Sequence, residues 1–168
     1  MKSAHQILVE QFMFHAKQEV PESPTIPDSK VRHLRARLIL EESLETIRAL
    51  GFAVTVPGFA GGHDIVLDSE DFSLSEFMAG PNLVDIIDGC VDISVVTTGT
   101  LSACGVPDMP FLDLVDGNNL SKFDPDKDGH WDEHGKWVRP SDHTPPDFSA
   151  LLSDLFPNRE VADDSVKM

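Results

Sequence analysis

Two acidic clusters, each set in an apolar run, constrain the fold of this chain more than any other feature of its sequence. The first is the segment Glu41-Glu42-Ser43-Leu44-Glu45, and the second places Asp85, Asp88 and Asp92 at spacings of three and four residues. Residues three and four apart share one face of an α-helix. The clusters therefore predict two helices, each carrying a stripe of carboxylates.

A stripe of carboxylates usually belongs to a solvated helix face, and one cluster alone would be interpreted that way. The second cluster, however, has apolar neighbours on nearly all sides: Val84, Ile86, Ile87, Val91, Ile93, Val95 and Val96. Ionised carboxylates are costly to bury among such side chains without a counter-charge. Hard divalent cations, Mg²⁺ above all, take oxygen ligands of this kind. We therefore expect the carboxylates to face a cleft and to hold metal.

The charge and size of the chain exclude several classes of protein. A net charge of −16 argues against non-specific binding to nucleic acid or to an anionic membrane. No apolar run reaches the length of about 18 residues that a transmembrane helix needs. The first residues lack the apolar core of a signal peptide. Cys90 and Cys104 lie in apolar helical sequence, so we expect buried, reduced thiols in a cytoplasmic protein.

The hydrophobic pattern predicts an all-α helical bundle. We expect helices over residues 3–18, 28–50, 81–104, 110–122 and 144–155, bounded mainly by prolines, glycines and capping side chains. The pattern over residues 52–78 predicts a short hairpin, with 52–56 opposite 65–67, or an ordered insertion. The pattern over residues 124–139 predicts a second hairpin around His134-Gly135. We expect one domain over residues 1–155 and a flexible tail over 156–168.

Several motifs together resemble a known superfamily. The first cluster has the form E-E-x-x-E, and Asp85-Ile86-Ile87-Asp88 has the form E-x-x-D, with Asp85 in place of the usual glutamate. Residues 88–100 are similar to a D-x-x-x-D-x-x-x-V-x-x-G-T helix, residues 118–122 to S-N-M-S-K, and residues 135–138 and 145–147 to G-K-x-x and P-P-D. Over about residues 3–152 the chain resembles the all-α nucleoside triphosphate pyrophosphohydrolases. This superfamily includes MazG, phosphoribosyl-ATP pyrophosphohydrolase and the dimeric dUTPases.

The resemblance implies a MazG-like fold and a metal-dependent reaction of water with a (d)NTP that gives a (d)NMP and diphosphate. It leaves dUTP, dCTP and the purine dNTPs open as substrates in nucleotide-pool control. The phosphoribosyl-ATP reaction is less favoured, because the motifs are closer to those of MazG-like members. It also implies two or three Mg²⁺ ions per site, replaceable by Mn²⁺, and a homodimer or homotetramer.

The same resemblance implies roles for individual residues. The metal ligands are Glu41, Glu42, Glu45, Asp85 and Asp88, and Glu41 or Glu42 orients or deprotonates the attacking water. Asp92 is expected to anchor a basic group. The substrate-binding candidates are Gln11, His15, Asn119, Lys122 and Lys136. Taken alone, each of these has a plainer role as a surface residue or, for Asn119, as a helix cap.

A second class of function stays open, namely a non-catalytic nucleotide-binding or sensor protein on the same helical scaffold. The intact acidic motif counts against it. Residues 124–129 imitate the start of a calcium-binding loop, but Gly135 occupies the position that would need a bidentate glutamate. The hydrolase is therefore the favoured interpretation.

Overall fold

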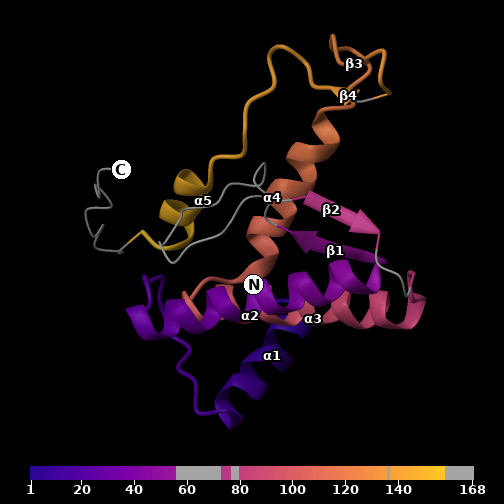
Figure 1. The fold of residues 1–168 in the computed structure, drawn as a ribbon. Coiled ribbons are helices and arrows are strands. Elements are labelled where there is room, and N and C mark those ends of the chain that lie inside the picture. The colour runs from indigo at the N-terminus through magenta and orange to yellow at the C-terminus, as the bar shows by residue number, and fades with distance from the viewer. Residues whose placement is uncertain (56–72, 77–79, 136, 158–168) are drawn as a thin grey trace. The chain divides into compact units, whose positions relative to one another are not determined.

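The structure is a computed structural model that describes residues 1–55, 73–76, 80–135 and 137–157. These residues form five α-helices and two short pairs of strands, which confirms the predicted all-α fold with small hairpins (Figure 1). The chain divides into two compact units. Unit 1 is Met1–Ile26 with Leu101–Met168, and unit 2 is Pro27–Thr100.

Unit 2 is built on two long helices, α2 (Ser29–Ala49) and α3 (Leu83–Ala103), the last three residues of α3 belonging to unit 1. Asp28 begins α2, because its side chain accepts a hydrogen bond of 2.8 Å from the backbone N–H of Val31. The chain leaves α2 at Gly51, whose φ of +90° is open to glycine at little cost. Both ends of α2 lie where the sequence predicts them.

The two helices come into close contact where Gly89 of α3 meets Thr46 of α2. A Cβ atom on Gly89 would overlap Thr46 Oγ1 and would lie 3.1 Å from both the Cα and the Cβ of Thr46. The Thr46 hydroxyl is held in place, since it donates a 2.7 Å hydrogen bond to the carbonyl of Glu42. The missing side chain at Gly89 thus sets the distance between the two acidic helices.

A two-stranded sheet follows α2. Strand β1 (Phe52–Thr55) pairs antiparallel with β2 (Ser73–Glu76), and the register sets Phe52 opposite Glu76 and Thr55 opposite Ser73. A strand pair is present at the predicted place, but β2 was not among the predicted strands. The expected segment 65–67 lies outside the described residues, whereas the observed β2 has the sequence Ser-Leu-Ser-Glu, which carries little hydrophobic signal.

Buried polar groups connect α1, the N-terminal helix, to the start of α4 within unit 1. Gln6 of α1 (Ala4–His15) is fully buried and bonds Ser102, the carbonyl of Val106 and the backbone N–H of Asp108. The Asp108 carboxylate accepts hydrogen bonds from the backbone N–H and the hydroxyl of Ser3. Every member of this network is satisfied, so it fixes α1 against the start of α4.

Helix α4 (Asp108–Ser121) begins two residues earlier than predicted. Pro110 therefore lies in the first turn, where the missing N–H of proline has no intrahelical partner to lose. The last helix, α5 (Phe148–Leu155), is capped by Asp147, whose side chain accepts from Ala150 N–H at 2.9 Å. The structure divides the chain into two compact units. That residues 1–155 form a single domain remains a prediction.

A small aromatic cluster joins α4 to the second pair of strands, β3 (His130–Trp131) and β4 (Trp137–Val138). The Trp137 ring stacks on Phe123 with centroids 4.8 Å apart, and Trp131 meets Trp137 edge-on at 5.2 Å. The Trp137 indole N–H donates to the carbonyl of Lys122 at 2.9 Å. The predicted hairpin around residues 134–135 is confirmed.

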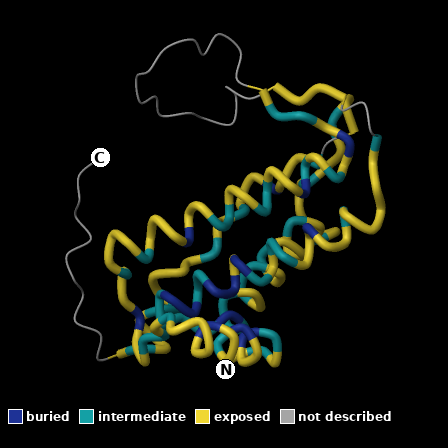
Figure 2. The backbone as a smooth tube through the Cα atoms, turned by 60° about the horizontal axis from the view of Figure 1, so that its bottom comes forward, coloured by how far each residue is buried: buried dark blue, intermediate teal, exposed yellow. Residues whose placement is uncertain are grey.

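Much of α2 and α3 is exposed or half-buried, as Figure 2 shows. Both cysteines are free, but Cys90 is exposed, contrary to the expected burial, because it shares the open face of α3 with Ile87 and Val91. By length and composition alone, α3 would suffice to cross a membrane, with a mean hydropathy of 1.3. Core helices of soluble proteins meet the same criterion.

Candidate functional site

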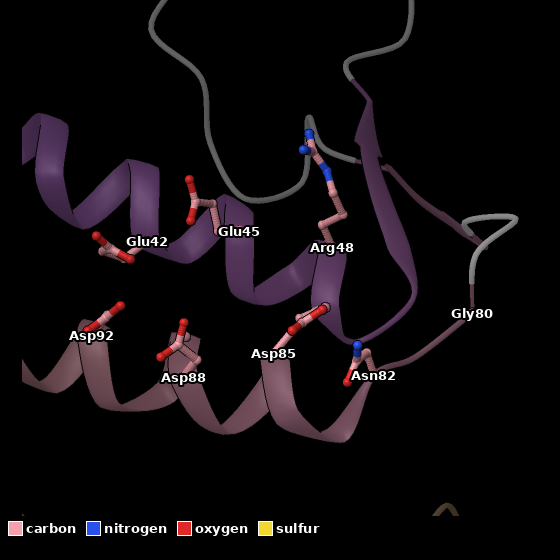
Figure 3. Close-up of a pocket in the computed structure, with 10 residues that line it drawn as sticks. Glu42, Glu45, Arg48, Gly80, Asn82, Asp85, Asp88 and Asp92 are labelled. Atoms are coloured by element: carbon pink, nitrogen blue, oxygen red, sulfur yellow. The ribbon is translucent and has the colours of Figure 1, made fainter.

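An open cleft of about 440 Å³ lies between α2 and α3 within unit 2. Figure 3 shows Glu42 and Glu45 on α2 and Asp85, Asp88 and Asp92 on the neighbouring helix α3, with Asp88 and Asp92 directed toward α2 and Glu42 opposite Asp92. The remaining lining residues are Arg48, Ala49, Gly80, Asn82 and Gly89. Helical spacing within each row and the close contact at Gly89 together produce the arrangement.

Four of the five predicted metal ligands line the cleft, and one does not. Glu42, Glu45, Asp85 and Asp88 belong to the lining, whereas Glu41 is exposed and does not contribute to it. Glu41 and Glu42 point in different directions because successive side chains on a helix are about 100° apart around its axis. With Thr46 turned toward Gly89, Glu42 faces α3 and Glu41 lies beside the row.

Asp92 is a fifth carboxylate in the cleft. It was expected to anchor a basic group, yet it lines the cleft with the other acids, and Figure 3 shows it opposite Glu42. No ion pair links it to a basic side chain of the described residues. Its spacing of four residues from Asp88 was the available signal that it shares the acidic face.

The proximity of these groups changes the chemistry of Glu42. Burial raises the pKa of the Glu42 carboxyl, and the negative charges of Asp92, Glu45, Glu41 and Asp88 raise it further, in that order. Each of these neighbours disfavours the ionised form of Glu42. The cleft is therefore self-repulsive when it contains only protein.

The donor set suits a hard divalent cation. In the described part of the chain, no three His, Cys, Asp or Glu side chains already converge closely enough to hold a metal ion. The chemistry nevertheless fits, because five carboxylates from two helices supply only oxygen ligands and their repulsion falls when a cation enters.

Sequence reasoning missed two polar residues of the lining, Arg48 and Asn82. Arg48 follows Glu45 by three residues, so its position on the same face of α2 was available as a signal. Asn82 begins α3, where its side-chain oxygen accepts from Val84 N–H at 3.0 Å. An asparagine at that point is typical of a helix cap, and nothing local indicates that it also lines a cleft.

The predicted substrate-binding residues that are described all belong to unit 1. Gln11 and His15 are exposed one turn apart on α1. Asn119 and Lys122 come together at the end of α4, where the Lys122 ammonium donates to the Asn119 side-chain oxygen at 2.7 Å. Lys136 lies outside the described residues.

Three basic side chains lie near the His143 ring, among several carboxylates of the same segment. Desolvation lowers the pKa of His143, and the charges of Lys122, Arg139 and Lys127 lower it further. Lys127 is already paired with Asp142 at 3.0 Å. The end of α4 thus combines cations with an amide side chain, a set that can bind phosphate.

Comparison with known proteins adds a family. A family model described as phosphoribosyl-ATP pyrophosphohydrolase matches residues 9–119, a span that includes both acidic helices and their cleft. No curated protein matches the chain significantly.

Proposed function

The chain belongs to the phosphoribosyl-ATP pyrophosphohydrolase family, and from this premise we propose that it hydrolyses a (d)NTP to the (d)NMP and diphosphate. The family supports a coarser statement, namely a pyrophosphohydrolase that acts on the acid anhydride of a nucleotide. The finer proposal rests on one observation above all, the five carboxylates from α2 and α3 that line a single cleft.

A cleft with this lining needs cations before it can accept a polyphosphate. We propose Mg²⁺, with Mn²⁺ as a substitute and two or three ions per site, held by Glu42, Glu45, Asp85 and Asp88. Bound metal would supply charge neutralisation on the phosphates and would lower the pKa of a water molecule. Asp92 adds a further carboxylate to this set.

Glu42 is the preferred group for orienting or deprotonating the attacking water. Glu41 was the other candidate, but Glu42 lines the cleft and Glu41 does not. A carboxylate within hydrogen-bond reach of the water can accept its proton. Glu41 acts on the site through its charge, which contributes to the raised pKa of Glu42.

The substrate is proposed from two directions. The motifs favour dUTP, dCTP or a purine dNTP, whereas the description of the matching family favours phosphoribosyl-ATP as a second candidate. A panel of NTPs, dNTPs and phosphoribosyl-ATP, incubated with Mg²⁺ or Mn²⁺, separates them by identification of the phosphate products. Monophosphate and diphosphate in equal amounts are the expected result. If the protein binds a nucleotide of the panel but hydrolyses none of them, the result would instead support the non-catalytic nucleotide-binding or sensor protein.

Asp88→Asn tests whether the cleft is the catalytic centre. The substitution keeps the size of the side chain and removes one charge from the middle of the α3 row. Turnover should fall by more than the roughly 10- to 100-fold that loss of an outer-shell partner costs a metal site. Asp124→Asn is the matched control, because Asp124 lies in unit 1 and accepts only a local bond from Asp126 N–H. Near-normal diphosphate release by Asp88→Asn would place the catalytic centre elsewhere.

A homo-oligomer is proposed from the open face of α3. Val84, Ile87 and Val91 are 73%, 57% and 54% exposed at helical spacing, so they form one apolar stripe. A second copy of the chain would bury this stripe, and a two-fold arrangement would let each copy cover the other.

Light scattering tests the assembly directly. The expected mass is at least twice the 18.5 kDa of one chain, and Ile87→Glu should reduce it toward one chain. Leu120→Glu, which changes a residue 74% exposed on α4, serves as the control and should leave the mass unchanged. A single-chain mass for the wild type at micromolar concentration would reject the oligomer.

A further inference from the structure

Arg48 is the one basic side chain among the described residues that line the acidic cleft. It projects from the last turn of α2, one turn beyond Glu45, and Figure 3 shows it at the end of the glutamate row. Its guanidinium forms no ion pair or side-chain hydrogen bond within the described part of the chain. Arg48 is also exposed.

The absence of a partner is informative because of what surrounds it. A guanidinium has five N–H donors in a planar fork and pairs readily with carboxylates, often through two bonds at once. Five carboxylates line the same cleft, yet none of them forms an ion pair with Arg48. The donors of Arg48 therefore remain available to a ligand that enters the cleft.

Among the residues that the structure describes, Arg48 is the group in the cleft that best suits an anion. The other polar side chains of this described lining are carboxylates and the amide of Asn82, whose oxygen already accepts from Val84 N–H. Around Arg48 the described lining is Ala49, Gly80 and Asn82, and none of these described residues offers an aromatic or large apolar surface for a nucleobase. A phosphate group is the part of a nucleotide that fits this end.

We propose that Arg48 binds the phosphates of the substrate that leave as diphosphate. The inference rests on the proposed function, because it specifies how that same cleft holds its substrate. The terminal phosphates carry the densest negative charge of a nucleoside triphosphate, and the fork of an arginine matches two phosphate oxygens. Arg48 thus holds the phosphate chain in position beyond the carboxylate rows.

A purely structural role predicts different behaviour. If Arg48 only offsets the repulsion among the carboxylates, then Arg48→Gln lowers the melting temperature of the metal-free protein, and saturating Mg²⁺ restores it. Binding of a phosphate ligand to the metal-loaded protein would then be unaffected. If Arg48 contacts phosphate, Arg48→Gln weakens the binding of a phosphate ligand to the metal-loaded protein and leaves the melting temperature of the metal-free protein nearly unchanged.

The experiment measures binding of inorganic diphosphate to the full chain by calorimetry in saturating Mg²⁺. Arg48→Gln should weaken binding by roughly 10- to 100-fold, the worth of hydrogen bonds to a charged group. Arg48→Lys should fall between the two, because it keeps the charge and loses the fork. A deoxynucleoside monophosphate should bind wild type and Arg48→Gln alike.

Arg32→Gln is the matched control. Arg32 is exposed on the same helix and loses the same single charge, but sixteen residues of helix set it about 24 Å from Arg48. Its diphosphate affinity should equal that of the wild type. A uniform effect of both substitutions would mean that net charge, not contact, governs binding.

The outcomes separate this inference from the proposed function. If the wild type hydrolyses a nucleotide and Arg48→Gln binds diphosphate normally, the assignment of Arg48 is wrong and the hydrolase stands. If no nucleotide is hydrolysed but diphosphate binding depends on Arg48, the hydrolase is rejected and the anion site stands. If the wild type binds no diphosphate at all in Mg²⁺, the inference is overturned.

Discussion

Gly89→Ala tests the contact that brings the two acidic helices together. The new methyl group would overlap Thr46 Oγ1 and would lie 3.1 Å from the Cα and Cβ of Thr46. Rotation of the Thr46 side chain would break its 2.7 Å hydrogen bond to the Glu42 carbonyl and would leave the contacts to Cα and Cβ in place. The helices must therefore separate, or one must turn.

The expected cost follows from two opposing effects. Overpacking of a tight contact typically costs about 1–3 kcal/mol, and a clash with backbone as well as side chain places this site at the upper end. Replacing glycine by alanine within a helix gains about 1 kcal/mol. The net loss in the free energy of unfolding should be roughly 2 kcal/mol. Spreading the rows should also weaken metal binding and turnover.

Gly117→Ala is the matched control, since it makes the same substitution inside a helix. Gly117 lies in α4, and a Cβ atom there would meet nothing within 4 Å. Only the propensity gain applies, so this variant should be about 0.5–1 kcal/mol more stable than the wild type. The two substitutions are predicted to differ in sign.

Urea unfolding followed by far-ultraviolet circular dichroism measures both variants. Adding Thr46→Ala to Gly89→Ala removes the clashing hydroxyl, so part of the lost stability should return even though the 3.1 Å contacts to Cα and Cβ persist. If Gly89→Ala is as stable as Gly117→Ala and keeps full activity, then Gly89 does not set the width of the cleft.

Three further predictions concern metal and pH. Saturating Mg²⁺ should raise the melting temperature of the wild type by mass action but not that of Asp88→Asn; an unchanged wild-type curve would argue against a metal site. The pKa of Glu42 is raised by burial and by the charge of Asp92, so its stabilising contribution is complete below the unfolded value near 4.5 and is lost as pH rises through the folded pKa. The metal-free protein should therefore lose stability over that rise, and Glu42→Gln should lose less. Burial would raise the pKa of Asp108, but hydrogen bonds from Ser3 outweigh it and lower the pKa, so this stabilisation is complete above the unfolded value near 3.8 and is lost as pH falls through the folded pKa. Asp108→Asn should flatten that acid loss in a pH series of unfolding curves, and a parallel loss in both proteins would contradict the role of Asp108.

The ends of α2 and the end of α3 were predictable because their signals are local, whereas α1 ends at His15 rather than at the predicted 18 and α5 begins at Phe148 rather than at the predicted 144. Asp28, Gly51 and Gly105 act on backbone groups a few residues away, so the sequence alone indicates where α2 and α3 begin or end. Strand β2 had no such signal. Its pairing depends on contacts with β1 across a long stretch of chain, and its own composition is mostly polar.

The candidate site was predictable in its residue types but not in its orientation. Spacing indicated which carboxylates share a face, and four of the predicted ligands do line one cleft. Whether Glu41 or Glu42 points inward depends on how α2 is turned, which the contact between Thr46 and Gly89 decides. Arg48 was missed because an arginine in the last turn of a helix is usually explained by the helix dipole.

The aromatic hairpin has a practical consequence for spectroscopy. Trp131 and Trp137 are the only tryptophans of the chain, which has no tyrosine, and both belong to unit 1. Intrinsic fluorescence therefore reports on unit 1 alone, while unit 2 and its acidic cleft are silent at those wavelengths.

A denaturation curve monitored by tryptophan emission can thus miss the unfolding of unit 2 and the loss of its acidic cleft. Circular dichroism sees the helices of both units, so coincident curves from the two methods would indicate that the units unfold as one, and separated curves would indicate two transitions. Phe52→Trp, at a side chain 38% exposed on β1, would give unit 2 an emission signal of its own.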